Sequence, residues 1–233
     1  MSALQRLGWK GLVARGWRRA TARLARAGSD IVLIKELDES GDAPLRSRLQ
    51  VSAHDGGDPA FLDRIPATWR ADPDQVALLR IYARRGYRAL FAEMEGTIVG
   101  HMWWVDGRAA NLQPHPHLTR YGVRLGPREA WAFNFFLDPR YRGGGNANEF
   151  LARFERHLRR RGFERVWGVV ASDNKPARWL YSLCGWRPQK VVDSVEIAGW
   201  LLFSQNGVYV RNSRRSGQAH DYRRIASRGW TVW

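Results

Sequence analysis

The chain has 233 residues, 44% of them hydrophobic and 12 of them tryptophan, so it can fill a sizeable core without covalent cross-links. Its one cysteine, Cys184, excludes an intramolecular disulfide framework and any site built from several cysteines. The apolar run at residues 130–137, interrupted by Asn134, is far shorter than the ~20 residues that cross a bilayer. We therefore expect a cytoplasmic protein, either soluble or peripheral at a membrane.

The positive charge is concentrated at the two ends of the chain. There are 38 Lys and Arg against 22 Asp and Glu, a formal net charge of +16. Residues 1–28 contribute +7 and residues 211–233 contribute +5, which leaves +4 for the 182 residues between them. Such ends attract nucleic acid, anionic lipid or an acidic protein. Only four of the bases are Lys, a bias that a GC-rich genome also produces, so charge alone leaves the partner open.

The first segment, residues 1–28, is predicted to form a basic amphipathic helix. Trp9, Val13, Trp17 and Leu24 share one helical face, with arginines opposite, and Gly28 ends the pattern. Such a helix could lie on an anionic membrane, dock on an acidic partner, or pack on the protein's own core. We accordingly divide the chain into this segment, a central domain at residues 29–210 and a basic tail at residues 211–233.

The central domain alternates strands and helices. Its first half predicts a strand at 31–34, a polar loop at 38–59, a helix at 74–85, a β-hairpin at 87–94 and 97–105, and a proline-containing connection at 106–127. Its second half predicts a strand at 129–137, a helix at 146–161, a strand at 164–171, a helix at 175–184, and strands at 190–197 and 200–210. This succession indicates an α/β or α+β domain.

A glycine loop joins the strand at 129–137 to the helix that follows. Arg140 and Arg142 precede Gly143, Gly144 and Gly145, and the helix begins directly afterwards. Glycines allow close backbone approach, and the N–H groups and dipole of a helix start favour an anion such as phosphate. A P-loop would need Lys and Ser or Thr after the glycines, and a dinucleotide-binding fingerprint would need a third glycine where Asn148 stands. Both fit poorly.

The pattern Arg140-x-x-Gly143-x-Gly145 resembles the pantetheine–pyrophosphate loop of the GNAT superfamily of N-acyltransferases. The similarity continues through Asp173-Asn174-Lys-Pro-Ala177 and Trp179-Leu-Tyr181-Ser-Leu-Cys-Gly-Trp186, and it covers residues 129–187. The resemblance implies an α/β (α+β) fold with a mixed, twisted sheet, helices on both faces and two central parallel strands that splay apart.

The resemblance also implies direct transfer of an acyl group, acetyl by family default, from acyl-CoA to a primary amine. Loop N–H groups would hold the pyrophosphate, two arginines would supply countercharge, and backbone at the end of the strand would polarise the thioester. The implied donor-binding residues are Phe136, Leu137, Arg140, Arg142, Gly143, Gly144, Gly145, Asn146, Ala147 and Asn174. No metal is implied.

Two residues are candidate catalysts under this resemblance. Tyr181 matches the position of a tyrosine that protonates the leaving thiolate, with helix packing as the alternative. Glu129 matches the base that deprotonates the attacking amine, with a solvated strand start as the alternative. Asn134 and Trp104 are candidate substrate contacts, although core packing is the alternative for Trp104, and Trp103 and Trp104 are expected on opposite sides of the sheet.

The remaining polar candidates are not expected to bind a ligand or to take part in catalysis. His115 and His117 are expected in a solvated loop, and Cys184 is expected to be a small buried hydrophobe. Two alternative functions stay open. One is transfer of a fatty acyl chain from long-chain acyl-CoA or from an acidic acyl carrier protein docked on the basic first segment. The other is a non-catalytic module that binds acyl-CoA or a polyanion, although nucleic acid is not favoured.

Overall fold

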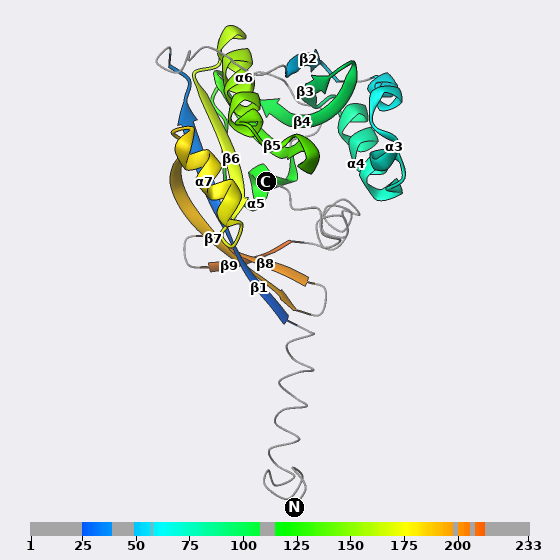
Figure 1. The fold of residues 1–233 in the computed structure, drawn as a ribbon. Helices are drawn as coiled ribbons and strands as arrows, with labels where there is room; N and C mark the ends of the chain where they lie inside the picture. Colours follow the sequence, from blue (N-terminus) through cyan, green and yellow to red (C-terminus); the bar gives the residue numbers. More distant parts are fainter. Residues whose placement is uncertain are drawn as a thin grey trace, which may run out of the picture.

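The computed structural model describes residues 25–38, 49–56, 58–107, 115–197, 200–205 and 208–212. One nine-stranded sheet organises these residues, and helices cover both of its faces (Figure 1). The spatial order is β2-β3-β4-β5-β6-β1-β7-β8-β9, in which β5 and β6 are parallel and every other neighbouring pair is antiparallel. This mixed sheet confirms the predicted fold class.

The elements follow the predicted succession in the central part of the chain. The strands are β1 (Ala25–Glu36), β2 (Gln50–His54), β3 (Arg88–Met94), β4 (Thr97–Asp106), β5 (Glu129–Leu137), β6 (Arg165–Ala171), β7 (Arg187–Ile197), β8 (Trp200–Gln205) and β9 (Val208–Asn212). The helices are η2 (Pro59–Arg64), α3 (Ala67–Arg70), α4 (Pro73–Arg84), α5 (Pro116–Arg120), η3 (Pro139–Tyr141), α6 (Asn146–Arg160) and α7 (Lys175–Leu183).

The expected segment boundaries at the two ends differ from the observed elements. β1 begins at Ala25, inside the segment assigned to the amphipathic helix, because residues 25–30 pair with residues 192–197 of β7. Tertiary pairing decides strand formation in this stretch of small and polar residues, where local β propensity is weak. Residues 1–24 lie outside the described residues. At the other end, β9 runs to Asn212, across the expected boundary at 210.

Three further differences concern short elements. β2 lies within the region expected to be a loop, α5 lies within the proline-containing connection, and the run at 200–210 forms the hairpin of β8 and β9 rather than one strand. β2 is an edge strand that pairs only with β3. α5 begins with Pro116, and its N-cap His115 accepts a hydrogen bond from the His117 N–H through its side chain. A histidine in that capping role is not among the usual N-cap signals.

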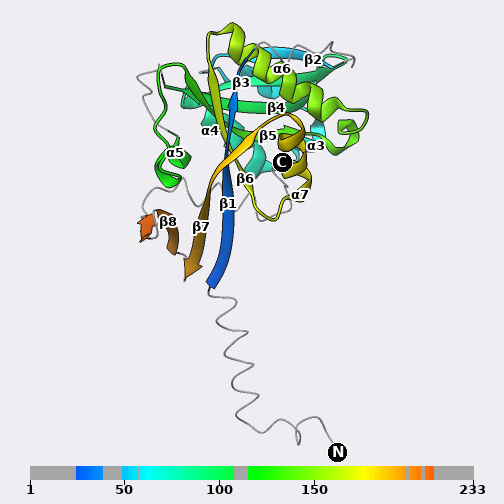
Figure 2. The same ribbon diagram turned by 90° about the vertical axis from the view of Figure 1, so that its left-hand side faces the viewer.

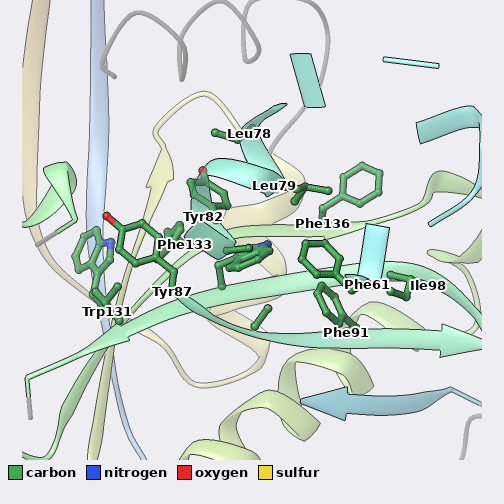
Figure 3. Packing of buried hydrophobic residues seen from close by; sticks show 14 of the residues in the cluster. Phe61, Leu78, Leu79, Tyr82, Tyr87, Phe91, Ile98, Trp131, Phe133 and Phe136 are labelled. Carbon is green, nitrogen blue, oxygen red and sulfur yellow. The ribbon is translucent and has the colours of Figure 1, made fainter. Parts of the chain in front are cut away.

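Two hydrophobic cores lie on opposite faces of the sheet. The first core packs η2, α3 and α4 against the sheet and is dominated by aromatic rings (Figure 3). The second packs α6 and α7 against the other face through Phe150, Phe154, Leu180 and other apolar side chains. Trp103 belongs to the first core and Trp104 to the second, which confirms that these neighbours face opposite sides.

The first described strand lies near the middle of the sheet. Residues 30–36 of β1 pair with β6 on one edge, and residues 25–34 pair with β7 on the other. Residues 25–29 pair with β7 alone, so β1 and β7 form a ribbon that extends past the rest of the sheet beside β8 (Figure 2). The sheet next to the β5–β6 pair is therefore completed by an early part of the chain.

A half-buried carboxyl group, that of Glu155, contacts a residue of the second core. Glu155 on α6 accepts a 2.6 Å hydrogen bond from the indole N–H of Trp186. Nearby, Lys35 of β1 donates to the Cys184 carbonyl oxygen at 2.8 Å. Desolvation by burial raises the pKa of Glu155 to about 7, against the opposing effects of Trp186 and Lys35. The folded protein therefore favours the protonated carboxyl group.

This raised pKa predicts a pH-dependent stability. The contribution of protonated Glu155 is complete below its ordinary pKa of 4.5 and is lost as pH rises through about 7. We expect the free energy of unfolding, measured with urea, to lose about 2–3 kcal/mol from this group between pH 5 and pH 8. Glu155→Gln should remove this loss. Glu149→Gln, on the same helix and ion-paired with Arg153, is the control that should retain it. Equal pH dependence in both variants would contradict the assignment.

Candidate functional site

The two parallel strands at the centre of the sheet part soon after they begin. β5 and β6 pair only at Glu129 with Arg165, Ala130 with Val166 and Trp131 with Trp167. β5 continues to Leu137 and β6 to Ala171, beyond the last of these pairs. Backbone groups on the facing edges then have no cross-strand partner in the other strand, so this gap can accept hydrogen bonds from an extended ligand. The predicted splay of the central parallel strands is confirmed.

A β-bulge lies where the strands part. The pairing of β5 with β4 jumps from Phe133 opposite Trp103 to Phe136 opposite His101, which leaves one extra residue in β5. Asn134 takes the left-handed conformation, with φ of 52°, which Asn tolerates better than most residues. The side chains on either side show the effect: Phe133 and Phe136 both join the first core, three positions apart, and Phe135 joins the second.

The glycine loop lies between the C-terminal end of β5 and the start of α6. Gly145 is the N-cap of α6, with φ of 83°, and no side chain caps the helix. Gly144 also has positive φ, at 64°. A Cβ added at Gly143, Gly144 or Gly145 would meet no heavy atom within 4 Å. The first N–H groups of α6 have no partners within the helix, so the loop offers an open anion cradle.

The charged residues of the loop are held by the end of β5. Arg140 forms a salt bridge with Asp138 at 2.9 Å, with its side chain 61% exposed. The Arg142 Nε group donates to the Leu137 carbonyl oxygen at 2.7 Å. Asn146 donates through Nδ2 to the Tyr141 carbonyl oxygen at 2.9 Å, which fixes the loop against the helix start. The sequence-predicted loop residues are thus brought together around the cradle.

Asn174, which the sequence predicts to contact the acyl-CoA donor, lies at the start of α7. The Asn174 side-chain oxygen caps this helix by accepting from the Ala177 N–H at 3.2 Å. Further along α7, Tyr181 is buried, with its ring 5.0 Å from that of Trp186. Burial raises the pKa of Tyr181, so the phenol stays protonated at neutral pH. Burial likewise raises the pKa of Cys184 to about 12, which keeps its thiol protonated.

Glu129 lies at the paired start of β5. Its carboxylate accepts hydrogen bonds from Arg165 at 2.6 Å, Trp167 at 3.2 Å and the Gly126 N–H at 2.9 Å. Burial acts to raise the pKa of Glu129, but these hydrogen bonds outweigh it and the net shift is downward. Arg165 also pairs with Glu36. No local sequence pattern marks Arg165 or Trp167 as partners of Glu129; the register of the parallel strands brings them there.

The candidate substrate contacts have different surroundings. Asn134 is the bulge residue at the splay, and its side chain is half-buried. Trp104 is fully buried beneath α6, where its ring packs 5.8 Å from Phe154 and 5.3 Å from His157. Packing in the second core is enough to account for a tryptophan at position 104. Its contact with substrate stays a prediction.

The expectation of a solvated loop at His115 and His117 is wrong. His115 is fully buried, and its ring centroid lies 4.0 Å from that of Phe133. His117 packs beside Tyr121 and Trp131. Desolvation lowers the pKa of both histidines, to about 3 for His117. The neighbouring prolines indicated a loop, but residues of β5 place apolar side chains against the two histidines.

The described residues contain neither a cluster of metal ligands nor a membrane-spanning helix. No group of three or more His, Cys, Asp or Glu side chains there is arranged to hold a metal ion. None of the helices in that part of the chain combines the length and the apolar character needed to cross a membrane.

Comparison with known proteins identifies the family. The model of the acetyltransferase (GNAT) family matches residues 59–186, which is more than half of the chain. The chain belongs to the GNAT acetyltransferase family. The match includes β5, the glycine loop, α6, β6 and α7. No curated protein matches this GNAT chain.

Solved structures resemble this chain at low sequence identity. A functionally unknown conserved protein from Staphylococcus epidermidis is 11% identical, with a TM-score of 0.52 over 80% of this chain and 67% of its own. A GCN5-related N-acetyltransferase from Sphaerobacter thermophilus is 16% identical, with a TM-score of 0.49 over 79% and 56%. A GNAT-family acetyltransferase described as putative, from Novosphingobium aromaticivorans, is 17% identical, with a TM-score of 0.43 over 73% and 63%. This chain thus spans about two thirds or less of each structure.

The open cradle predicts a specific effect of steric filling. Gly145→Trp should weaken binding of coenzyme A at least tenfold, because the indole would occupy the space that faces the first N–H groups of α6. Gly96→Trp is a matched control, since Gly96 also has positive φ and open space around it but lies in the turn between β3 and β4. Isothermal titration calorimetry measures both affinities. Equal binding by the two variants would exclude this loop as the pyrophosphate site.

Proposed function

We propose that this GNAT enzyme transfers an acetyl group from acetyl-CoA to the nitrogen of a primary amine. The observation that supports this most is the continuity of two features. The splayed edges of β5 and β6 can hold an extended pantetheine arm, and the gap leads to the glycine cradle at the start of α6, which suits a pyrophosphate. Arg140 and Arg142 would lie beside the phosphates as countercharges.

The proposed reaction is a direct displacement at the thioester carbonyl carbon. The neutral amine attacks this carbon, a C–N bond forms, and the C–S bond breaks after a tetrahedral oxyanion. Backbone groups near Phe136 and Leu137 would meet the pantetheine arm and stabilise the developing negative charge. Tyr181 would give a proton to the leaving thiolate, a role that suits a phenol kept protonated by burial. Asn174 would contact the arm from the start of α7, and Asn134 would face the acceptor.

The attacking amine must lose a proton, and Glu129 is the proposed acceptor of that proton. Its three hydrogen-bond donors make it a weak base, and its net pKa shift is downward. Its position at the paired end of β5 lies several residues before the bulge, so water molecules would have to relay the proton along the strand. The benefit of such a base is its permanent ionisation at neutral pH, which keeps it ready to accept a proton.

The acyl donor can be tested directly with a series of acyl-CoAs. We expect native mass spectrometry to show retention of acetyl-CoA, and free thiol to be released from it when primary amines are added. Retention of only long chains would overturn the acetyl assignment and favour fatty-acyl transfer. Retention of none of the donors would favour an acyl carrier protein as donor, and retention without amine-dependent thiol release would favour a binding module.

The proposed function of Glu129 as a proton acceptor can be separated from its ion pair with Arg165. Glu129→Gln should lower kcat about 10²-fold with little change in KM for acetyl-CoA, because a proton acceptor is lost. Glu36→Gln is the control, since Glu36 shares Arg165 at 2.9 Å but has no other role in the proposal. Steady-state kinetics with a series of amines measures both. If both variants lose activity equally, Glu129 acts through Arg165 and is not the base.

A further inference from the structure

A buried histidine contacts the bulge of β5 from the neighbouring strand. His101 of β4 pairs with Phe136, immediately after the bulge. Its Nδ1 atom lies 3.0 Å from the Asn134 carbonyl oxygen, at hydrogen-bond distance. The side chain is 1% exposed, and its ring stacks 5.4 Å from Phe136 and meets Trp69 edge-on at 5.8 Å. The imidazole is therefore held in place by burial and by packing against two aromatic rings.

The proton on this ring follows from its surroundings. Desolvation by burial lowers the pKa of His101 to about 4, so the imidazole is neutral at pH 7. A neutral imidazole facing a carbonyl oxygen makes a hydrogen bond only if Nδ1 carries the proton. Nε2 then has no proton, and it is buried without a hydrogen-bond partner among the described residues. The hydrogen bond to the Asn134 carbonyl oxygen therefore helps to fix the orientation of this buried ring.

The bulge also changes which strand the backbone of β5 faces. The Glu129 carbonyl oxygen accepts from the Gly107 N–H, and the Asp138 N–H donates to the Val99 carbonyl oxygen, so both residues direct their backbone groups to the β4 side. Residues nine positions apart in a regular strand would face opposite edges. The one extra residue at Asn134 shifts the alternation by one position, so that Glu129 and Asp138 both face β4. This extra residue lies where β6 no longer pairs with β5.

We propose that His101 is a positioning residue, which holds the Asn134–Phe135 peptide so that the Phe135 N–H faces the gap between β5 and β6 and hydrogen-bonds the thioester carbonyl oxygen. In a trans peptide the C=O and N–H groups point in opposite directions. Because the Nδ1–H of His101 holds the carbonyl oxygen toward β4, the N–H of the same peptide points away from β4. The inference rests on the proposed acyl transfer for its ligand, but the geometry of the peptide can be tested without that reaction.

The test compares His101→Leu with His101→Asn. The two replacements have the same number and branching of side-chain heavy atoms and both remove the ring, but only the Asn amide keeps a donor near the position of Nδ1. In crystal structures of the unliganded variants, we expect the Asn134–Phe135 peptide to rotate in the Leu variant and to keep its orientation in the Asn variant. Unchanged orientation in the Leu variant would overturn the proposal, whether or not the protein has acetyltransferase activity.

The kinetic part of the test uses thiol release from acetyl-CoA. His101→Leu should lower kcat about 10²-fold, the effect of losing one preorganised oxyanion donor, while KM for acetyl-CoA changes less than threefold because the glycine cradle is untouched. His101→Asn should recover at least tenfold of kcat. Equal losses in the two variants, or a loss confined to KM, would contradict the proposal. Absence of thiol release by the wild-type enzyme with every amine would instead refute the proposed function, and the crystal structures would still decide the role of His101.

Discussion

The parting of β5 and β6 is the constraint on which the site depends. A strand inside a sheet normally satisfies its N–H and C=O groups on both edges, because unpaired buried backbone groups are costly. Here the pairing stops after Trp131 and Trp167, although both strands continue. The bulge at Asn134 and the pairing of β5 with β4 on its other edge keep the strand in place beyond this point. The result is a rigid strand with one edge available to a ligand.

Much of this arrangement was predictable from the sequence. The apolar strand at 129–137, the glycines at 143–145 and the amphipathic helix after them are local signals, and local signals place an anion cradle well. The bulge was not predicted, although Asn134, a residue type that tolerates the left-handed conformation, interrupts the apolar strand. Both faces of the sheet carry an apolar core, so the adjacent Phe135 and Phe136 fit a regular strand as well as a bulged one.

The errors have a common physical origin in contacts between distant parts of the chain. Ala25 begins a strand because it lies opposite Ile197, and β2 forms because β3 offers it an edge. His115 is buried because it packs on Phe133. His101 drew no attention in the sequence, because its significance arises from the carbonyl that β5 places beside it. The partners of Glu129 likewise depend on the parallel register, which local patterns do not reveal.

The position of β1 has a consequence for how the molecule is made. Its partners in β6 and β7 lie more than a hundred residues further along the chain, so β1 leaves the ribosome long before either exists. Contacts of such sequence separation slow folding, because a large loop must close before they form. During synthesis the strand at 25–36 is an open edge that has to avoid other chains. The late arrival of β7 therefore covers the second edge of β1 and ends the period in which this edge can pair wrongly.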